Sequence, residues 1–407
     1  MRALLRTDLL AAFLFGGASL AGCTSSSPSS PSGEAPAATD AGATHAGATD
    51  AGAPDTGAAD AGAADAGAPD AGGVALRVPA LGPVPDLPVS AGDPPTDAKI
   101  ALGSMLYIDA RLSGSGHTAC ASCHGYQTAF QDNLITPIPD RSYPNDRPAL
   151  TRNTLSFFNI VYAPVMRWDG SQTNLASAMA FPWSEANMNL GTDLPSAQPV
   201  LQQRLTVTAP NYVPLFQQAY GQDIRTLTPD AVWTLAGRAL AAFVRQAVSR
   251  DAPFDRWNAG DDTAMSSAAV AGLAVFQGKG RCIACHSGPF FTDFSFHNIS
   301  SSPPESDGGR ADEGRYDVTG VAADEGSFLT PTLRGAYDTA PYFHDGSEAG
   351  FFSVLDFLNS SAVTADPNHD PVFDTPLGLT TDDETNLVAF LTALRGTPVT
   401  VVPATPP

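Results

Sequence analysis

The spacing of apolar and polar positions along the chain predicts a series of helices. Apolar residues recur every three to four positions, as on one face of a helix, in the ranges 97–109, 230–249 and 265–276. Thr228-Pro229-Asp230 supplies a start signal for the second of these helices. A last helix is predicted from the capping box Thr381-x-x-Glu384 to Gly396. Shorter segments at 154–160, 174–179 and 354–359 are interpreted as further helices.

Loops are expected where this periodicity stops. Residues 297–350 are rich in Gly, Asp, Ser and Pro, and a similar cluster at 250–262 is interpreted as a domain boundary. A chain of 407 residues is long enough for two ordinary domains. The sequence therefore predicts a mostly α fold with long loops and few strands, divided into domains at 78–255 and 256–407.

The first 77 residues have a different character. Arg2 and Arg6 precede an apolar run at 9–15, which is too short to span a membrane, and Leu20-Ala21-Gly22-Cys23 follows. This pattern predicts a lipoprotein signal over 1–23 with lipidation at Cys23; the alternative is a plain signal peptide. Thr24 is similar to the outer-membrane sorting pattern, so we expect a lipid-anchored protein of the periplasmic cell envelope. Residues 24–77 contain almost nothing large and apolar and are expected to form a disordered tether.

The net charge of −21 limits the partners of the chain. No basic face is available to meet phosphate, which argues against nucleic acid. An acidic protein suits a basic redox partner, although the charge also serves solubility. The membrane is expected to be contacted through the lipid anchor only.

Two copies of one motif carry the chemistry: Cys120-Ala121-Ser122-Cys123-His124 and Cys282-Ile283-Ala284-Cys285-His286. Two thiols at this spacing can add to the two vinyl groups of one haem, and the next His then becomes the proximal iron ligand. A zinc knuckle or a redox dithiol is the alternative, but neither needs a His directly after the second Cys. The sequence thus predicts two covalently bound haem c groups and leaves no pair of cysteines for a structural disulfide.

Further motifs surround these two sites in a fixed order. They are Leu112-Ser113, Thr151-Arg152-Asn153-Thr154, Arg167-Trp168-Asp169-Gly170, Phe296-His297-Asn298-Ile299, Thr330-Pro331-Thr332-Leu333-Arg334, Ala340-Pro341-Tyr342-Phe343-His344-Asp345-Gly346 and Pro376-Leu377-Gly378-Leu379-Thr380. From about residue 95 to 396 the chain resembles the bacterial dihaem cytochrome c peroxidases and their MauG-type relatives. The resemblance implies two cytochrome c-like helical domains, each built around one haem.

The resemblance also implies roles for single residues. Hydrogen peroxide would react at the N-terminal haem, with electrons passed on by the C-terminal haem from a small c-type cytochrome or another redox protein. Trp168 matches the position between the haems and is a plausible relay; an ordinary buried aromatic is the alternative. A calcium ion between the domains would take the side chain of Asn153 and main-chain carbonyls near Leu329–Pro331. Homodimers are common in the family, but the sequence indicates no interface.

Three departures from the family pattern concern the irons and the peroxide pocket. First, the sequence has no His between His124 and His286, so we expect the first iron to be open to peroxide. The sulfur atoms of Met166, Met179 and Met188 could ligate it, but core packing is the expected role of each.

The second departure is in the peroxide pocket. Where the family has a Gln and then a Glu, this chain has Ala178 and Asn187, while Pro182 matches. Asn cannot act as a general acid or base. Glu185 either replaces the missing acid or is a solvated surface charge.

The third departure is at the second iron. Leu358 stands where the family has a Met or Tyr ligand, and Leu has no lone pair for iron. Either this iron is five-coordinate or another group binds it; His369 and His344 are candidates, and His297 is a weaker one. For each, a hydrogen bond that fixes a loop is the expected role.

Three functions remain open from the sequence. The first is reduction of hydrogen peroxide by a dihaem peroxidase. The second is MauG-type oxidation of side chains on a partner protein, and the third is a non-enzymatic electron-transfer cytochrome. We expect a peroxide-reactive dihaem oxidoreductase, because a pure electron carrier gains little from an open iron.

Overall fold

The computed structural model describes residues 76–88, 92–144, 150–305, 309–397 and 403–407. The predicted signal, Cys23 and nearly all of the predicted tether lie outside these ranges. The chain divides into two units, 1–68 and 69–407, and all described residues belong to the second. None of the helices within the described ranges combines the length and apolar character needed to cross a membrane.

The first half of this unit is organised around helix α6 (Pro229–Val244), which is buried along most of its length. It contacts α1 (Asp97–Ile108), α3 (Leu175–Ala180) and α4 (Leu194–Gln203), and α5 (Tyr212–Tyr220) packs against α1. Gly103 makes the close approach of α1 to α6 possible, because a Cβ there would lie 1.8 Å from the carbonyl oxygen of Ala239. The short helix α2 (Cys120–Cys123) carries the first Cys-x-x-Cys-His motif.

In the second half, a glycine likewise allows two helices to approach closely. Helices α8 (Ser267–Gln277) and α11 (Thr381–Thr392) pack together, and a Cβ on Gly272 would lie 1.9 Å from the carbonyl oxygen of Asn386. Helices α7 (Pro253–Asn258), α9 (Tyr316–Thr319) and α10 (Phe351–Asn359) complete this half. Strands β1 (Phe296–His297) and β2 (Phe328–Leu329) form one antiparallel pair, with Phe296 opposite Leu329.

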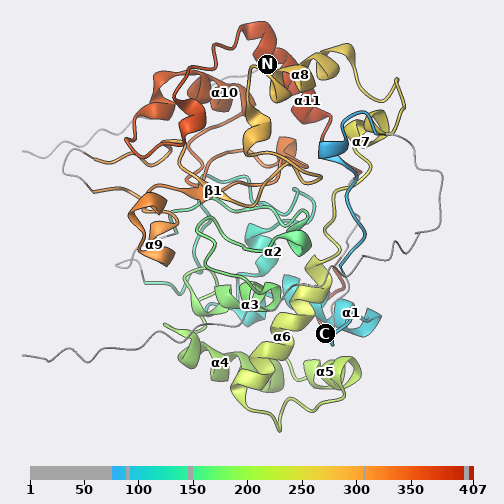
Figure 1. The fold of residues 1–407 in the computed structure, drawn as a ribbon. Helices are drawn as coiled ribbons and strands as arrows, with labels where there is room; N and C mark the ends of the chain where they lie inside the picture. Colours follow the sequence, from blue (N-terminus) through green and yellow to red (C-terminus); the bar gives the residue numbers. More distant parts are fainter. Residues whose placement is uncertain (1–75, 89–91, 145–149, 306–308, 398–402) are drawn as a thin grey trace, which may run out of the picture. The chain divides into compact units, whose positions relative to one another are not determined.

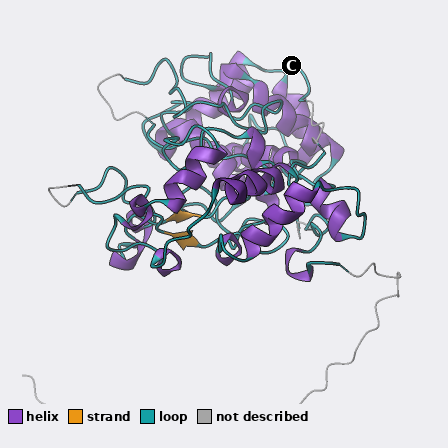
Figure 2. Ribbon diagram, turned by 90° about the horizontal axis from the view of Figure 1, so that it is seen from above, coloured by secondary structure: helices purple, strands orange, loops and turns teal. Residues whose placement is uncertain are grey.

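Two hydrophobic cores correspond to the two halves. One contains buried residues between Leu102 and Ala247, and the other contains Leu81 and buried residues from Phe254 to Leu394. Figure 1 shows α1 and α3 to α6 gathered in one region and α8, α10 and α11 in another, with long loops and β1 between them. Helices and loops dominate the view in Figure 2, where the strands are one small pair. The predicted mostly helical fold with few strands is confirmed.

Each end of the described chain packs on the half to which it does not belong in sequence. Leu81 is fully buried in the second core, and the N–H of Val78 donates to the side-chain oxygen of Asn258 at 2.7 Å. At the other end, the N–H of Ala404 donates to Ser104 on α1 at 3.2 Å. Each end of the described chain thus packs on the half that is remote from it in sequence. The domain boundary expected at 250–262 stays a prediction.

Six of the seven predicted helices are present with shifted ends, and one is absent. The predicted helices at 97–109, 174–179, 265–276 and 354–359 correspond to α1, α3, α8 and α10. Helix α11 has its capping box at Thr380 and Asp383, one residue before the predicted pair.

The helix predicted at 154–160 is wrong, and the helix predicted at 230–249 ends early. Asn159 explains both results. It has a left-handed backbone with a φ of 62°, its N–H donates to the carbonyl of Ala247 at 2.8 Å, and its side chain accepts from the N–H of Ser249 at 3.1 Å. These bonds replace the helical bonds that the end of the longer α6 would need.

Candidate haem-binding cavity

One continuous cavity of about 1210 Å³ connects the two Cys-x-x-Cys-His motifs. Its lining includes Cys120, Cys123 and His124 from the first motif, and Cys282, Cys285 and His286 from the second. A pocket for a single small molecule is typically about 300–1,000 Å³, so this cavity exceeds what one such ligand fills. The two predicted haem attachment sites therefore open into a shared, mostly apolar space.

The two histidines are held in the same way. Nδ1 of His124 lies 3.1 Å from the carbonyl oxygen of Phe130, and Nδ1 of His286 lies 2.9 Å from that of Phe291. A carbonyl only accepts, so Nδ1 carries the proton in each ring, and this is the usual second bond of a metal-binding His. The ring of His124 also stacks on Phe157, with centroids 3.9 Å apart.

Burial determines the protonation states of both motifs. Burial lowers the pKa of His124 to about 4 and also lowers the pKa of His286, so both rings are neutral, as iron ligation requires. Burial raises the pKa of Cys120, Cys123 and Cys282 to about 12. Two Cys-x-x-Cys-His motifs with neutral, carbonyl-bonded histidines on one shared cavity define a dihaem c-type cytochrome.

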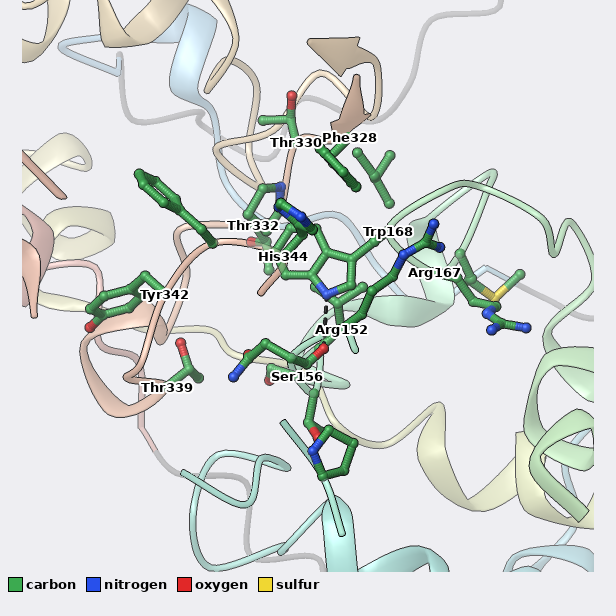
Figure 3. A pocket seen from close by; sticks show the side chains of 18 of the residues that line it. Arg152, Ser156, Arg167, Trp168, Phe328, Thr330, Thr332, Thr339, Tyr342 and His344 are labelled. Carbon is green, nitrogen blue, oxygen red and sulfur yellow. Dashed lines mark hydrogen bonds between the residues drawn. The ribbon is translucent and has the colours of Figure 1, made fainter. Parts of the chain in front are cut away.

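Trp168 joins the two halves beside this cavity. Its indole Nε1 donates to the carbonyl of Asn153 at 2.8 Å, and its own carbonyl accepts from the N–H of Leu329 at 2.8 Å. The side chain is 9% exposed. In Figure 3, the indole lies among side chains from both halves, with Arg152 and His344 nearby. Trp168 thus lies where the two halves meet, and its role as a relay stays a prediction.

The residues predicted for the peroxide pocket all line the cavity. These are Ala178, Pro182, Glu185 and Asn187, together with the three methionines Met166, Met179 and Met188. Each methionine is also buried in the first core. Glu185 Oε2 lies 3.5 Å from Arg167 Nη2, and burial raises the pKa of this carboxyl despite the opposing effect of Arg167. A cavity-lining carboxyl with a raised pKa is suited to proton transfer.

Arg152 forms a charged network that sequence reasoning missed. Its guanidinium lies 2.5 Å from Asp169, 2.7 Å from Asp312 and 3.4 Å from Asp317. The Thr-Arg-Asn-Thr and Trp-Asp-Gly motifs contain Arg152 and Asp169. Asp312, however, lies in a Gly- and Asp-rich loop with no signal of its own. The network ties that loop to the segment that carries Trp168.

The three candidate ligands for the second iron occupy different environments. His344 lines the cavity, is 4% exposed and stacks on Phe328 with centroids 3.7 Å apart. His297 is held between two carboxylates, with Nδ1 2.6 Å from Asp370 and Nε2 2.8 Å from Asp293. Both ring nitrogens of His297 are thus occupied by carboxylates, which leaves neither free to bind iron.

His369 does not line the cavity that the described residues form. Its Nδ1 donates to the carbonyl of Asp366 at 2.7 Å, and its Nε2 lies 3.1 Å from Asp374, so it fixes a loop. Leu358 does line the cavity, from helix α10. The residue at the usual ligand position is thus aliphatic and faces the space where a ligand would be needed.

The residues predicted to bind calcium lie close together but have other partners. Oδ1 of Asn153 accepts from Gln131 at 3.2 Å, and its Nδ2 donates to the carbonyl of Leu134 at 2.8 Å. Leu329 reaches Asn153 through Trp168, which is bonded to both. The carbonyl of Pro331 interacts with the ring of His286.

Comparisons with known proteins agree with this site. The family model for di-haem cytochrome c peroxidase matches residues 97–263. A cytochrome-c peroxidase IdrP1 from Denitromonas iodatirespirans is 36% identical over 349 residues, covering 79% of this chain and 88% of that protein. The methylamine utilization protein MauG from Methylophilus methylotrophus is 35% identical, with 76% and 86% covered.

A solved structure is also similar. A MauG-like protein associated with microbial copper homeostasis matches with a TM-score of 0.65 and 25% identity, covering 77% of this chain and 93% of that one. The chain belongs to the di-haem cytochrome c peroxidase family. The resemblance read from the sequence is confirmed, and with it an oxidoreductase with two haem c groups as cofactors.

Proposed function

We propose that this protein reduces hydrogen peroxide at the haem held by His124, with electrons relayed from the haem held by His286. The observation that carries the proposal is the single cavity that both attachment motifs line, with Trp168 at the junction of the halves. The haem groups, when bound, supply the redox chemistry. The chain positions them, keeps the proximal rings neutral and provides Glu185 as a proton carrier beside the peroxide.

The proton carrier is the part of the proposal that depends on this chain alone. Glu185 lines the cavity next to Pro182, while Asn187 has no titratable proton. Burial raises the pKa of Glu185, which strengthens its carboxylate as an acceptor of a proton from peroxide. We therefore assign the acid/base role to Glu185 rather than to the position that the family uses.

Addition of hydrogen peroxide to the diferric protein, followed by stopped-flow spectroscopy, tests the proposal. A rapid change of the Soret band is expected. An unchanged band leaves an electron-transfer cytochrome and contradicts the peroxidase function. Steady-state consumption of peroxide with a reduced small c-type cytochrome then measures whether an external donor supplies the electrons.

A second candidate function is oxidation of side chains on a partner protein. The relative named MauG, 35% identical to this chain, favours it. Turnover of peroxide without an added small donor, in the presence of a partner protein, would support this function over the first. Both functions use the same cavity and differ in where the electrons originate.

The cellular setting is part of the proposal. The predicted lipoprotein signal, with Cys23 as the lipidated residue, supports a protein tethered to the cell envelope, and the weak sorting pattern at Thr24 favours the outer membrane. Metabolic labelling with a fatty acid, compared with a Cys23→Ala variant, tests the anchor. Incorporation that persists in the variant would contradict it.

A calcium ion at Asn153 is proposed with a specific requirement. Oδ1 of Asn153 now accepts from Gln131 at 3.2 Å, so the ion would have to replace that bond. Backbone carbonyls near Leu329 would complete a set of hard oxygen donors. Metal analysis of protein purified with and without a chelator tests the site, with Asn153→Ala as the variant expected to lose the ion.

A further inference from the structure

Five arginine side chains line the cavity, and they differ in how firmly their neighbours hold them. Four have short polar contacts: Arg152 with Asp169 and Asp312, Arg281 with the carbonyl of Thr375, Arg310 with Asp366, and Arg334 with Asp255. Arg167 is different. Its nearest carboxylate among the described residues is Glu185, at 3.5 Å.

The surroundings of Arg167 leave its charge available to a ligand. Its side chain is 36% exposed and that of Glu185 is 32% exposed, and a long ion pair of this exposure contributes little. The guanidinium carbon lies 4.9 Å from the centroid of the Phe181 ring, which orients the group without neutralising it. Arg167 and Phe181 both line the part of the cavity that the first half of the chain forms.

We propose that Arg167 makes this part of the cavity a binding site for small monovalent anions, with the hydroperoxide anion as its natural ligand. The inference rests on the proposed function and adds a residue to it. Hydrogen peroxide gives one proton to the carboxylate of Glu185, and the HOO⁻ that remains pairs with the guanidinium. Glu185 becomes neutral in the same step, so one anionic partner of Arg167 replaces another and the local net charge is unchanged.

This pair of residues can compensate for the Gln and Glu that the family has in the peroxide pocket and that this chain lacks. A pocket with Ala178 and Asn187 lacks the family's polar pair, but a guanidinium and a carboxyl face the same space. A fixed cation beside a developing anion stabilises it. Arg167 thus supplies the charge, and Glu185 accepts the proton.

Anion affinity of the resting protein tests the proposal without any turnover. Fluoride, an anionic iron ligand, and imidazole, a neutral one, are titrated into the diferric holoprotein at pH 7, with absorbance spectra as the readout. Arg167→Leu is expected to weaken fluoride binding about 10- to 100-fold, the range for one hydrogen bond to a charged group. Imidazole binding should change less than about twofold, and Arg167→Lys should retain part of the fluoride affinity.

A second variant separates a charge effect from a structural one. Glu185→Gln should tighten fluoride binding, because it removes the carboxylate that competes for Arg167, and the gain should vanish when Arg167→Leu is added. Arg225→Leu is the matched control, since Arg225 is 64% exposed and paired with Asp223 on the surface. The affinities of this variant for fluoride and for imidazole should match those of the unaltered protein.

Two results would overturn the proposal. One is fluoride affinity unaffected by Arg167→Leu, and the other is an equal loss for fluoride and imidazole, which would mean that Arg167 only shapes the pocket. Neither result bears on whether the Soret band responds to peroxide. Failure of the anion site is therefore distinguishable from failure of the proposed peroxidase function.

Discussion

The backbone carbonyl of Trp168 accepts a hydrogen bond from the N–H of Leu329 at 2.8 Å, which joins the first half of the chain to the second at this residue. The indole nitrogen is bonded in turn to Asn153, within the first half. Trp168 is therefore fixed at both its backbone and its side chain. A relay between two redox groups gains from such rigidity, because its distance to each group stays constant.

Replacing Trp168 by Phe tests this junction. The variant leaves the carbonyl of Asn153 without its indole donor, so we expect the free energy of unfolding to fall by about 1–3 kcal/mol. Electron supply from the second site to the first should slow, measured as the rate at which the donor cytochrome is oxidised. Trp257→Phe is the control, since Trp257 packs at the second core with Arg77 over its ring. Equal donor oxidation rates in the two variants would contradict a relay role for Trp168.

The sequence could predict the parts of this site that depend on local order. The spacing of Cys120, Cys123 and His124 indicates a haem site without any knowledge of the fold, because thioether formation and ligation are local. Likewise, the periodicity that predicts α1 arises within one segment. Trp168 was found through its motif and not through its contacts.

Features that depend on distant segments were beyond sequence reasoning. Asn159 accepts a hydrogen bond from the N–H of Ser249, ninety positions later in the chain. This bond between distant residues overrides the helical periodicity of both segments. The partners of Arg152 lie on a loop near residue 312, where composition indicates only irregular structure. The meeting of Arg167 with Glu185 depends in the same way on how the chain folds back.

The acid/base role of Glu185 predicts a specific pH profile. Burial raises the pKa of its carboxyl, so the deprotonated form that accepts a proton from peroxide accumulates only above the ordinary range of Glu. The rate of reaction with peroxide should rise with pH through this raised pKa. In Glu185→Gln, the rate should fall about 100-fold, and its rise with pH should disappear.

Asn187→Glu is the matching test of the alternative position. If Glu185 is the proton carrier, adding a carboxyl at Asn187 should change the rate of peroxide reaction by less than about threefold, well below the 10²–10⁴-fold typical of a general acid or base. A large gain would show instead that the family position lacks its acid and that Glu185 does not replace it. The two variants are best compared by stopped-flow measurement at several pH values.

The ion pair between Arg334 and Asp255 is expected to be important for stability. Arg334 is 1% exposed and makes two bonds to Asp255, at 2.7 and 2.8 Å, which tie the Thr-Pro-Thr-Leu-Arg segment to α7. Arg334→Leu removes the charged partner of Asp255, which is mostly buried and keeps only the N–H of Ala252, so the free energy of unfolding should fall by about 1–3 kcal/mol. Denaturant unfolding measures this change. Arg395→Leu, which removes a half-exposed ion pair with Asp338, should lower it by less than about 1 kcal/mol.

Leu358 allows a direct test of iron coordination at the second site. It lines the cavity from α10, so Leu358→Met should place a thioether sulfur where the family has its ligand and convert the second iron to a six-coordinate, low-spin state. Electron paramagnetic resonance of the resting ferric protein counts high-spin and low-spin irons before and after the change. Phe352→Met is the control on the same helix, because Phe352 is 51% exposed and should leave the spectrum unchanged. A low-spin second iron in the unaltered protein that becomes high-spin in His344→Ala would instead identify His344 as the ligand. In that case Leu358→Met should leave the spin state unchanged.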